Sequence, residues 1–168
     1  MANNIVEIRD MTVEFKKPRG SLLAVNHVDF DVREGCVTAL VGESGSGKST
    51  LAFTILNIVN TTGKILSGEV KYEGNDILKL SDEELRRYKW KEVSMIFQSA
   101  QSALNPLMTI RQHFWETYLV HEPHAKEDDV LPRFRQLLED VRLDPDRVLG
   151  LYPHELSGGM KQRVMIAF

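Results

Sequence analysis

The chain has 168 residues, which is enough for one domain with a hydrophobic core of its own. Its 21 basic and 24 acidic residues give a formal net charge of −3, so the composition offers no electrostatic argument for nucleic acid as a partner. A single cysteine, Cys36, excludes an internal disulfide and a cysteine-based zinc cage, and it indicates a reducing compartment. No apolar run approaches the roughly 20 residues of a membrane helix, and residues 1–4 lack the basic and apolar regions of a signal peptide.

The first part of the chain predicts antiparallel strands. Residues 5–15 and residues 22–32 alternate between apolar and polar side chains, which is typical of half-buried strands. Between them, residues 16–21 form a polar loop with proline and glycine. The apolar run 37–41 then predicts a short buried strand.

The next nine residues match the phosphate-binding pattern G-x-x-x-x-G-K-[ST], and an apolar run that predicts a helix, residues 51–59, follows them. The glycines let successive backbone N–H groups turn toward a phosphate chain, and the helix N-terminus adds a partial positive charge. Lys48 would reach the β- and γ-phosphates, and the Ser49 hydroxyl would bind Mg²⁺. A chain of this length matches the pattern by chance roughly once in 200, so a glycine-rich turn that binds nothing is the weaker interpretation. The loop consists of Gly42, Glu43, Ser44, Gly45, Ser46, Gly47, Lys48, Ser49 and Thr50.

A short strand and a helix are predicted next. Residues 63–68, with a glycine at each end, are expected to break the chain, and residues 69–74 to form a strand and a turn. Ser81 and Glu84 have the spacing of a capping box, which predicts a helix over about 82–89.

The apolar run 93–97 predicts another buried strand, which ends at Gln98. Residues 99–106 then form a polar connection that ends in proline. Thr109 can cap a helix that runs to about residue 121, with apolar side chains at helical spacing.

The remaining residues predict three helices. One covers residues 127–141, with Pro132 near its first turn or at a break. Asp144 can cap a second, short helix that begins with proline, and Ser157 can cap a third that begins with two glycines and runs to residue 168.

Together these motifs resemble the nucleotide-binding domain of ABC transporters. In that family an aromatic A-loop residue, the Walker A loop, the Q-loop, a helical subdomain and the signature LSGGQ follow one another along the chain. Lys48 precedes Gln98 by 98 − 48 = 50 residues and Ser157 by 157 − 48 = 109 residues, and both spacings suit the family. The matching positions are Phe15, the loop 42–50, Gln98, residues 99–156 and Leu156-Ser157-Gly158-Gly159-Met160.

The resemblance covers nearly the whole chain and implies an α/β fold. That fold is a P-loop NTPase with a RecA-like core, an N-terminal antiparallel β-subdomain and a helical subdomain, with the C-terminal part of the core missing. Residues 1–98 would form the β-subdomain and the P-loop core up to the Q-loop, 99–156 the helical subdomain, and 157–168 the start of the signature helix.

A closer resemblance is to the ATPases of peptide/nickel importers. It rests on Glu43-Ser44 in the loop, on residues 102–109 and 152–155, and on Met160 in place of a glutamine. It implies an ATP-binding subunit that couples ATP binding and hydrolysis to the import of dipeptides or oligopeptides, or of nickel. Such a subunit is peripheral at the cytoplasmic face of the cell membrane and works with an extracytoplasmic solute-binding protein. Import rather than export rests on this resemblance alone.

The resemblance also implies roles at the nucleotide, with ATP and Mg²⁺ as cofactors. Phe15 would stack on adenine, the alternative being a strand residue of the core. The loop 42–50 would bind the phosphates, with Ser49 on Mg²⁺. Gln98 would contact Mg²⁺ or the attacking water and sense the membrane subunit, the alternative being a surface polar residue at a strand end.

Partners are implied in the same way. Ser157, Gly158 and Gly159, with Leu156 and Met160 of the signature, would hold the ATP bound to a second ATP-binding subunit in a head-to-tail dimer, the alternative being a plain helix cap. The segment from Gln98 to Met108, with its apolar pairs 103–104 and 107–108, would dock integral membrane permease subunits, the alternative being internal packing. No nucleic acid is expected.

The resemblance stops at the signature helix. In the family a Walker B aspartate, a catalytic glutamate, a D-loop and a switch histidine come later, so the catalytic base is absent from this chain. We therefore expect that the chain is part of a longer protein, has an open hydrophobic sheet edge, and binds ATP without hydrolysing it. The alternatives are a non-hydrolysing regulatory module and a soluble ABC ATPase acting on DNA or ribosomes. The acidic charge and residues 104–106 argue against the latter, and a small-molecule kinase has no use for residues 156–159.

Overall fold

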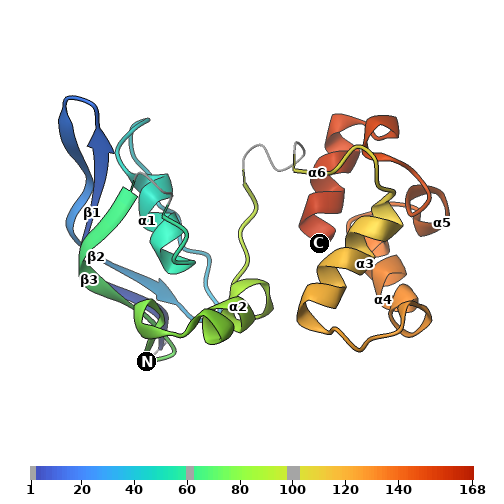
Figure 1. The fold of residues 1–168 in the computed structure, drawn as a ribbon, viewed down its shortest axis with the longest axis horizontal. Helices are drawn as coiled ribbons and strands as arrows, with labels where there is room; N and C mark the ends of the chain where they lie inside the picture. The colour runs from blue at the N-terminus through green and yellow to red at the C-terminus, as the bar shows by residue number, and fades with distance from the viewer. Residues whose placement is uncertain (1–2, 60–62, 98–102) are drawn as a thin grey trace. The chain divides into compact units, whose positions relative to one another are not determined.

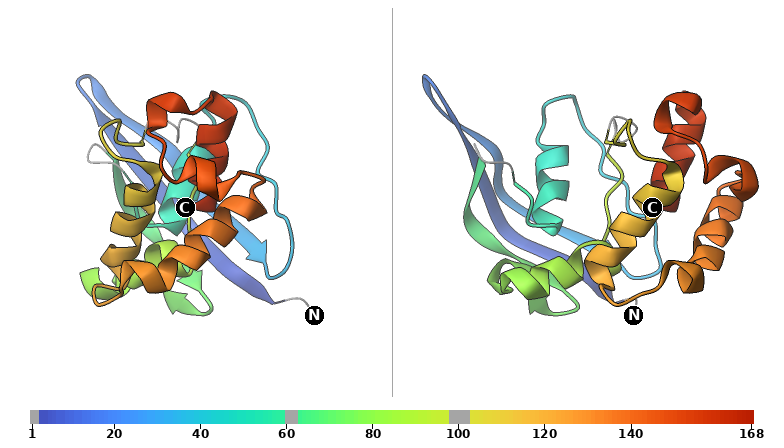
Figure 2. Two further views of the ribbon diagram at one scale, coloured as in Figure 1. Left: turned by 90° about the vertical axis from the view of Figure 1, so that its right-hand side faces the viewer. Right: turned by 45° about the vertical axis from the view of Figure 1, so that its right-hand side comes forward.

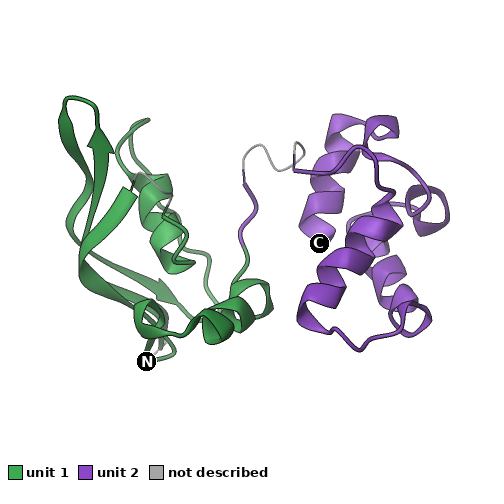
Figure 3. Ribbon diagram, in the orientation of Figure 1, with its two compact units in different colours: residues 1–94 green, residues 95–168 purple. Residues whose placement is uncertain are grey.

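The computed structural model describes residues 3–59, 63–97 and 103–168. The chain divides into two compact units, residues 1–94 (unit 1) and residues 95–168 (unit 2), which are coloured separately in Figure 3. The predicted boundary between residues 98 and 99 lies outside the described residues, so the division into domains made from the sequence stays a prediction.

Unit 1 is built on an antiparallel sheet with the strand order β2-β1-β3-β4, seen at the left of Figure 1. The predicted strands over 5–15 and 22–32 are confirmed as a hairpin. The expected chain break at 63–68 is wrong, because β3 begins at Gly63 and pairs with β1 along that stretch. The strands are β1 (Asn4–Lys17), β2 (Gly20–Arg33), β3 (Gly63–Tyr72) and β4 (Asn75–Asp76).

A line of bulges crosses this sheet at one level. Asp10 in β1, His27 in β2 and Gly68 in β3 all have positive φ, at 48°, 50° and 106°, and the register of β1 with both neighbours shifts there. Gly68 also comes so close to β1 that a Cβ atom on it would lie 2.6 Å from the Cα of Met11. Gly68 therefore marks a bulge inside a strand and not the end of one.

The core of unit 1 lies between the sheet and helix α1 (Lys48–Ile55), which faces the sheet in Figures 1 and 2. Leu51 and Thr54 are the buried side chains of α1, and the phenol of Tyr88 donates a hydrogen bond to the carbonyl of Ile55, the last residue of α1, at 2.7 Å. The buried side chains of the sheet are Val6, Ile8, Met11, Thr12, Val13, Val25 and Val70.

The 3-10 helix η1 (Ile77–Lys79) precedes helix α2 (Asp82–Lys91), to which Tyr88 belongs. The predicted capping box is confirmed, because the Ser81 hydroxyl accepts from the backbone N–H of Glu84 while the Glu84 carboxylate accepts from that of Ser81. α2 therefore begins at the predicted residue.

The two predicted buried strands over 37–41 and 93–97 are wrong. In the described part of the chain neither segment joins the sheet, and the one pairing found there is an isolated bridge between Lys89 and Val93. A buried strand needs hydrogen-bonded neighbours, and the sheet of unit 1 is assembled without these two segments. The apolar side chains of 37–41 are exposed, Val37 fully. In 93–97 Ile96 is 55% exposed, whereas Val93 and Met95 are half-buried.

Unit 2 is helical, and four of its helices have the predicted starts. Thr109 and Ser157 cap α3 (Ile110–His121) and α6 (Gly158–Ala167) through their hydroxyls, and Asp144 caps α5 (Pro145–Val148) through its carboxylate. Helix α4 (Glu127–Asp140) continues through Pro132, and the 3-10 helix η3 (Pro153–Glu155) leads toward α6.

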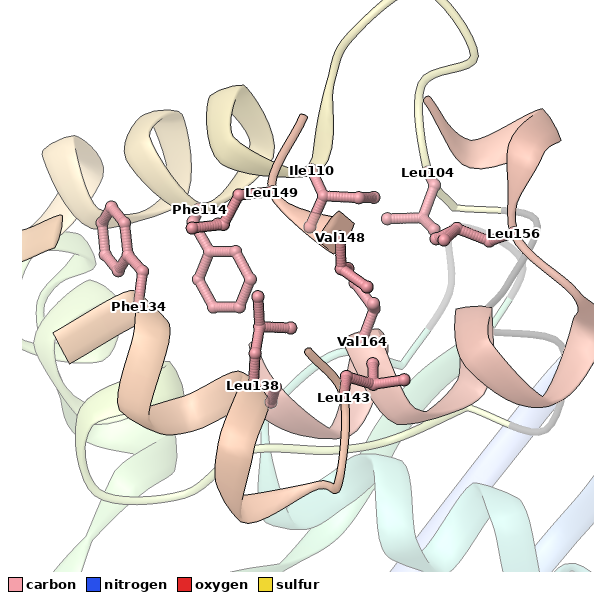
Figure 4. Close-up of a cluster of buried hydrophobic side chains, with 11 residues drawn as sticks. Leu104, Ile110, Phe114, Phe134, Leu138, Leu143, Val148, Leu149, Leu156 and Val164 are labelled. Carbon is pink, nitrogen blue, oxygen red and sulfur yellow. The ribbon is translucent and has the colours of Figure 1, made fainter. Parts of the chain in front are cut away.

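One hydrophobic cluster holds these helices together (Figure 4). Phe114 of α3 lies against Phe134 of α4, with ring centroids 5.1 Å apart, and the backbone N–H of Ile110 bonds to the carbonyl of Leu151. The buried members of the cluster are Leu104, Ile110, Phe114, Phe134, Leu138, Leu143, Val148, Leu149, Leu156, Val164 and Ala167. Among the described residues, no helix combines the length and apolar character that a membrane crossing requires.

Candidate functional site

The predicted phosphate-binding loop, residues 42–50, lies in unit 1 and runs directly into α1. The helix begins at Lys48, three residues earlier than the predicted residue 51. The backbone N–H of Ser46 donates to the carbonyl of Glu43 at 3.2 Å, so the loop closes on itself before Gly47. Within the described residues no side chain caps α1 at Gly47, and the first N–H groups of the helix are therefore available to an outside acceptor.

Gly47 fixes the loop against the sheet. Its φ of 90° lies in the left-handed region, and a Cβ atom on it would lie 2.1 Å from the carbonyl oxygen of Ala24 in β2. No side chain fits at that distance, so the last glycine of the pattern has a steric role as well as a conformational one. The contact with Ala24 was missed from the sequence, because no local pattern indicates which strand a loop touches.

The side chain of Lys48 folds back onto the loop that precedes it. Its ammonium group donates to the carbonyls of Gly42 at 2.9 Å and Glu43 at 2.5 Å, and to the hydroxyl of Ser46 at 3.3 Å. The positive charge is thus held at the loop by oxygen atoms, the kind of acceptor that phosphate also offers. Ser49 is exposed in the first turn of α1, next to Lys48.

A pocket of about 270 Å³ adjoins the loop. Ser46 and Lys48 contribute polar groups to its lining, and the exposed residues Leu40 and Val41 contribute apolar ones. The loop, its lysine and this pocket form the candidate site of unit 1. The lining consists of Ala24, Val25, Asn26, Val28, Leu40, Val41, Ser46, Gly47, Lys48 and Leu51.

Phe15 lies half-buried near the end of β1. It is opposite Leu22 of β2 and Gly63 of β3, and a Cβ atom on Gly63 would lie 2.8 Å from Cε1 of the Phe15 ring. The ring therefore covers Gly63. The tip of the β1–β2 hairpin and the phosphate-binding loop lie toward the same end of unit 1 in Figures 1 and 2. This position is compatible with adenine stacking, which stays a prediction.

The predicted signature residues lie at the start of α6 in unit 2. Leu156 is buried in the cluster of this unit, whereas Ser157, Gly158 and Gly159 are exposed. The Ser157 hydroxyl accepts from the backbone N–H of Met160 at 3.3 Å. A Cβ atom on Gly159 would meet nothing within 4 Å, so no neighbour among the described residues requires a glycine there.

The predicted docking segment is described only in part. Gln98 lies outside the described residues, and its predicted contacts with Mg²⁺, water and a membrane subunit stay predictions. Of the apolar residues after it, Leu104 packs inside the cluster of unit 2, as the alternative of internal packing requires. Leu107 does not, because 83% of its surface is exposed.

In a comparison with protein families, residues 25–168 match the family described as ABC transporter. A dipeptide transport ATP-binding protein of Caldanaerobacter subterraneus subsp. tengcongensis is 40% identical over 97% of this chain and 50% of its own length. An oligopeptide transport ATP-binding protein of Salmonella typhimurium is 39% identical over 99% of this chain and 49% of its own length. The chain thus spans about half the length of the curated relatives it matches.

Two solved structures have a similar fold. A bacterial ABC transporter cassette in dimeric form matches with a TM-score of 0.77 and 26% identity, over 96% of this chain and 67% of the other. The ATP-binding cassette in a dimeric post-hydrolysis state, bound to ADP and Pi, matches with a TM-score of 0.75 and 29% identity over the same shares of the two chains. The α/β fold predicted from the sequence is therefore confirmed.

Proposed function

The chain belongs to the ABC transporter family, and from that premise we propose that it forms the ATP-binding part of an importer for dipeptides or oligopeptides. The observation that carries the proposal is the loop 42–50, with its lysine held among oxygen atoms at the uncapped start of α1. Relatives at 36–40% identity whose names specify dipeptide or oligopeptide transport support the choice of cargo.

Residues of unit 1 would bind the nucleotide and orient its phosphates, its Mg²⁺ and its adenine ring. The backbone of the loop 42–50 and the Lys48 ammonium would hold the phosphates, the Ser49 hydroxyl would hold Mg²⁺, and Phe15 would stack on adenine. The donor set fits an anion, because the loop offers N–H groups and a cation at a helix N-terminus. Bound ATP would supply the free energy of phosphate transfer. Gln98 would complete the magnesium ligands.

Other surfaces would serve partners. The exposed residues 157–159 would meet the ATP of a second ATP-binding subunit in a head-to-tail dimer, which the dimeric form of a similar cassette supports. The region from Gln98 to Met108 would dock integral membrane subunits. The assembly would then lie at the cytoplasmic face of the membrane and receive its cargo from an extracytoplasmic solute-binding protein.

For these 168 residues alone we propose ATP binding without turnover. Of the residues that we propose to act at the nucleotide, none is a base that could activate the attacking water. Titration with ATP and Mg²⁺ tests binding. Lys48→Ala is expected to weaken it about 10- to 100-fold, the effect of losing a charged hydrogen-bond donor. Lys126→Ala, which removes the same charge at an exposed position of unit 2, should leave it unchanged.

Two results would contradict the proposal. Equal ATP affinity of the wild type and Lys48→Ala would exclude the loop as the binding site. Steady hydrolysis by the 168-residue chain that disappears in Lys48→Ala would exclude binding without turnover.

A further inference from the structure

The tip of the β1–β2 hairpin is a free end of unit 1. Lys17 in β1 pairs with Gly20 in β2, and the chain turns between them. Residues 16–23 are all exposed, whereas Val13 and Val25, further down the two strands, are buried. In Figures 1 and 2 the hairpin continues past α1, the helix that faces the sheet. The tip therefore lies beyond the core of unit 1.

The charges of this hairpin are divided unevenly between its two ends. Residues 14–24, toward the tip, contain three cations and one acid, whereas residues 4–13 and 25–33 together contain four acids and two cations. A positive end thus belongs to a molecule whose formal net charge is −3. The three cations, called the basic tip from here on, are Lys16, Lys17 and Arg19.

The basic tip is not neutralised by neighbouring acids. None of the ion pairs found among the described residues includes any of its three cations. Further down the hairpin the opposite holds, because Arg9 forms ion pairs with both Glu7 and Asp31. The acid of the tip region, Glu14, is directly opposite Lys64 of β3, and cross-strand neighbours of opposite charge attract each other. The charge of the basic tip is therefore available to an outside anion.

Two exposed leucines lie beside the basic tip. Leu22 and Leu23 of β2 are each 46% exposed, although Leu22 is directly opposite Phe15 of β1. Consecutive residues of a strand point to opposite faces, so the hairpin carries one apolar side chain on each face just below its tip. Cations together with exposed apolar side chains are what binding at an anionic membrane surface requires. A soluble anion or a nucleic acid would use the cations but leave the leucines in water.

We propose that the basic tip, with Leu22 and Leu23, binds the anionic headgroups of a lipid bilayer. An anionic surface attracts the tip and repels the acidic remainder of the molecule, so the protein would approach the lipid with this hairpin first. The membrane setting rests on the proposed function, but lipid binding by the tip requires neither ATP nor another subunit. The tip precedes residues 25–168, over which the family match extends.

The number of cations sets the expected strength of this contact. A lysine or arginine near an anionic membrane surface contributes about fivefold in affinity, so the basic tip as a whole should contribute about 100-fold. The attraction decays over a Debye length, which is about 10 Å at 0.1 M salt and about 3 Å at 1 M. Binding should therefore be reversible and should be lost at high salt.

Cosedimentation of the 168-residue chain with lipid vesicles tests the proposal. The wild type is expected to bind vesicles of phosphatidylcholine and phosphatidylglycerol and not vesicles of phosphatidylcholine alone. Changing the whole basic tip to glutamine should weaken binding about 100-fold. These substitutions are Lys16→Gln, Lys17→Gln and Arg19→Gln.

A matched control removes three exposed cations of unit 2 that take part in none of the ion pairs found among the described residues. It has the same net charge as the basic-tip variant and should bind the anionic vesicles as the wild type does. Urea unfolding checks that both variants are folded. The control substitutions are Lys126→Gln, Arg133→Gln and Arg147→Gln.

The leucines separate a lipid surface from other anions. Leu22→Ser combined with Leu23→Ser should weaken binding to the anionic vesicles about tenfold, because two half-exposed apolar side chains lose their burial in the interface. Short duplex DNA, added at constant ionic strength, should not displace the wild type from the vesicles.

Several results would overturn the proposal. Equal binding by the basic-tip variant and its matched control would show that position on the hairpin is unimportant, and equal binding to both kinds of vesicle would exclude recognition of headgroup charge. Wild-type binding by the leucine variant, or displacement by DNA, would reduce the tip to a general contact for anions. Lys48→Ala should bind vesicles as the wild type does, so failure of lipid binding and failure of the proposed function are separate results.

Discussion

At the scale of single residues, Gly47 links the conformation of the phosphate-binding loop to its contact with the sheet. Its left-handed φ and its 2.1 Å approach to the Ala24 oxygen are separate constraints, one local and one through space. The sequence pattern predicted the glycine and the helix after it, because both are set by neighbours along the chain. It could not predict Ala24, since the approach of β2 depends on how unit 1 packs.

Gly47→Ala should therefore affect both binding and stability. We expect ATP affinity to fall by at least about tenfold and the free energy of unfolding by about 1–3 kcal/mol, because the loop must leave β2. Gly45→Ala is the matched control, since Gly45 also has a positive φ, of 81°, but a Cβ atom there meets nothing within 4 Å. Nucleotide titration and urea unfolding measure the two effects. If both variants lose the same amounts, strain in φ alone explains them and the contact with Ala24 is unimportant.

Gly63 permits the position of the Phe15 ring. A methyl group there would lie 2.8 Å from the ring and 2.5 Å from Val59, so Gly63→Ala must displace both side chains or move the backbone. We expect ATP affinity to fall about fivefold, the effect of about 1 kcal/mol of lost stacking. Affinity for tripolyphosphate, which has no base, should not change. A parallel loss for both ligands would show that the loop was damaged instead.

At the scale of elements, the sequence predicted the starts of helices better than the strands of a core. Ser81, Thr109, Asp144 and Ser157 each cap a helix through a bond to an N–H two or three residues ahead, so a short stretch of sequence contains the whole interaction. A buried strand depends on partners far along the chain. Residues 37–41 and 93–97 have the composition of such strands, but the described residues supply no sheet neighbours for them.

Tyr88 links two of these elements. Its hydroxyl donates to the carbonyl of Ile55, so α2 satisfies a backbone group at the end of α1. Burial, together with the neighbouring ring of Tyr72, raises the pKa of Tyr88 well above its ordinary value of about 10. Because the folded state favours the neutral phenol, its contribution to stability is complete below about pH 10 and is lost as the pH rises further.

Tyr88→Phe should lower the free energy of unfolding by about 1 kcal/mol at neutral pH, the effect of one lost hydrogen bond. Above about pH 10 its stability should fall less steeply than that of the wild type, because Phe does not ionise. Urea unfolding at several pH values measures the difference. Tyr152→Phe, at an exposed position, is the control. Identical slopes for the wild type and Tyr88→Phe would show that the phenol has no part in alkaline destabilisation.

At the scale of the whole molecule, we expect the exposed apolar segment 37–41 to be the main cause of self-association. Val37 is fully exposed and Val41 is 89% exposed, on a stretch of chain that pairs with no strand among the described residues. Such a segment favours association with other extended chains. Val37→Lys with Val41→Lys should therefore lower self-association, measured by light scattering over a range of concentrations. Leu66→Lys, at a 49% exposed position inside β3, is the control. Unchanged scattering would mean that another surface drives association.

The whole molecule also shows why the family could be recognised although two predicted strands were wrong. The phosphate-binding loop and the signature residues are short continuous stretches of sequence, whereas strand pairing in the sheet depends on segments that lie far apart along the chain. An error in predicting a strand leaves the order of these motifs along the chain unchanged, and the family match extends over residues 25–168, which contain both motifs.

The line of bulges across the sheet limits which insertions and deletions the strands β1, β2 and β3 can accept. Ile8 pairs with Phe30 and Val13 with Val25, so β1 and β2 each advance five residues between these pairs despite the shifts. Between Arg9 and Val13 the partners on β3 advance four residues on both strands in the same way. The extra residue of β1 is thus balanced by one in each neighbour. Deleting Asp10 alone would shift the register on one side of the bulge by one residue. The core side chains of that part of β1 would then point to the opposite face of the sheet. In evolution, an insertion or deletion at the bulge in β1 would therefore be expected together with a matching change at the bulges of β2 and β3.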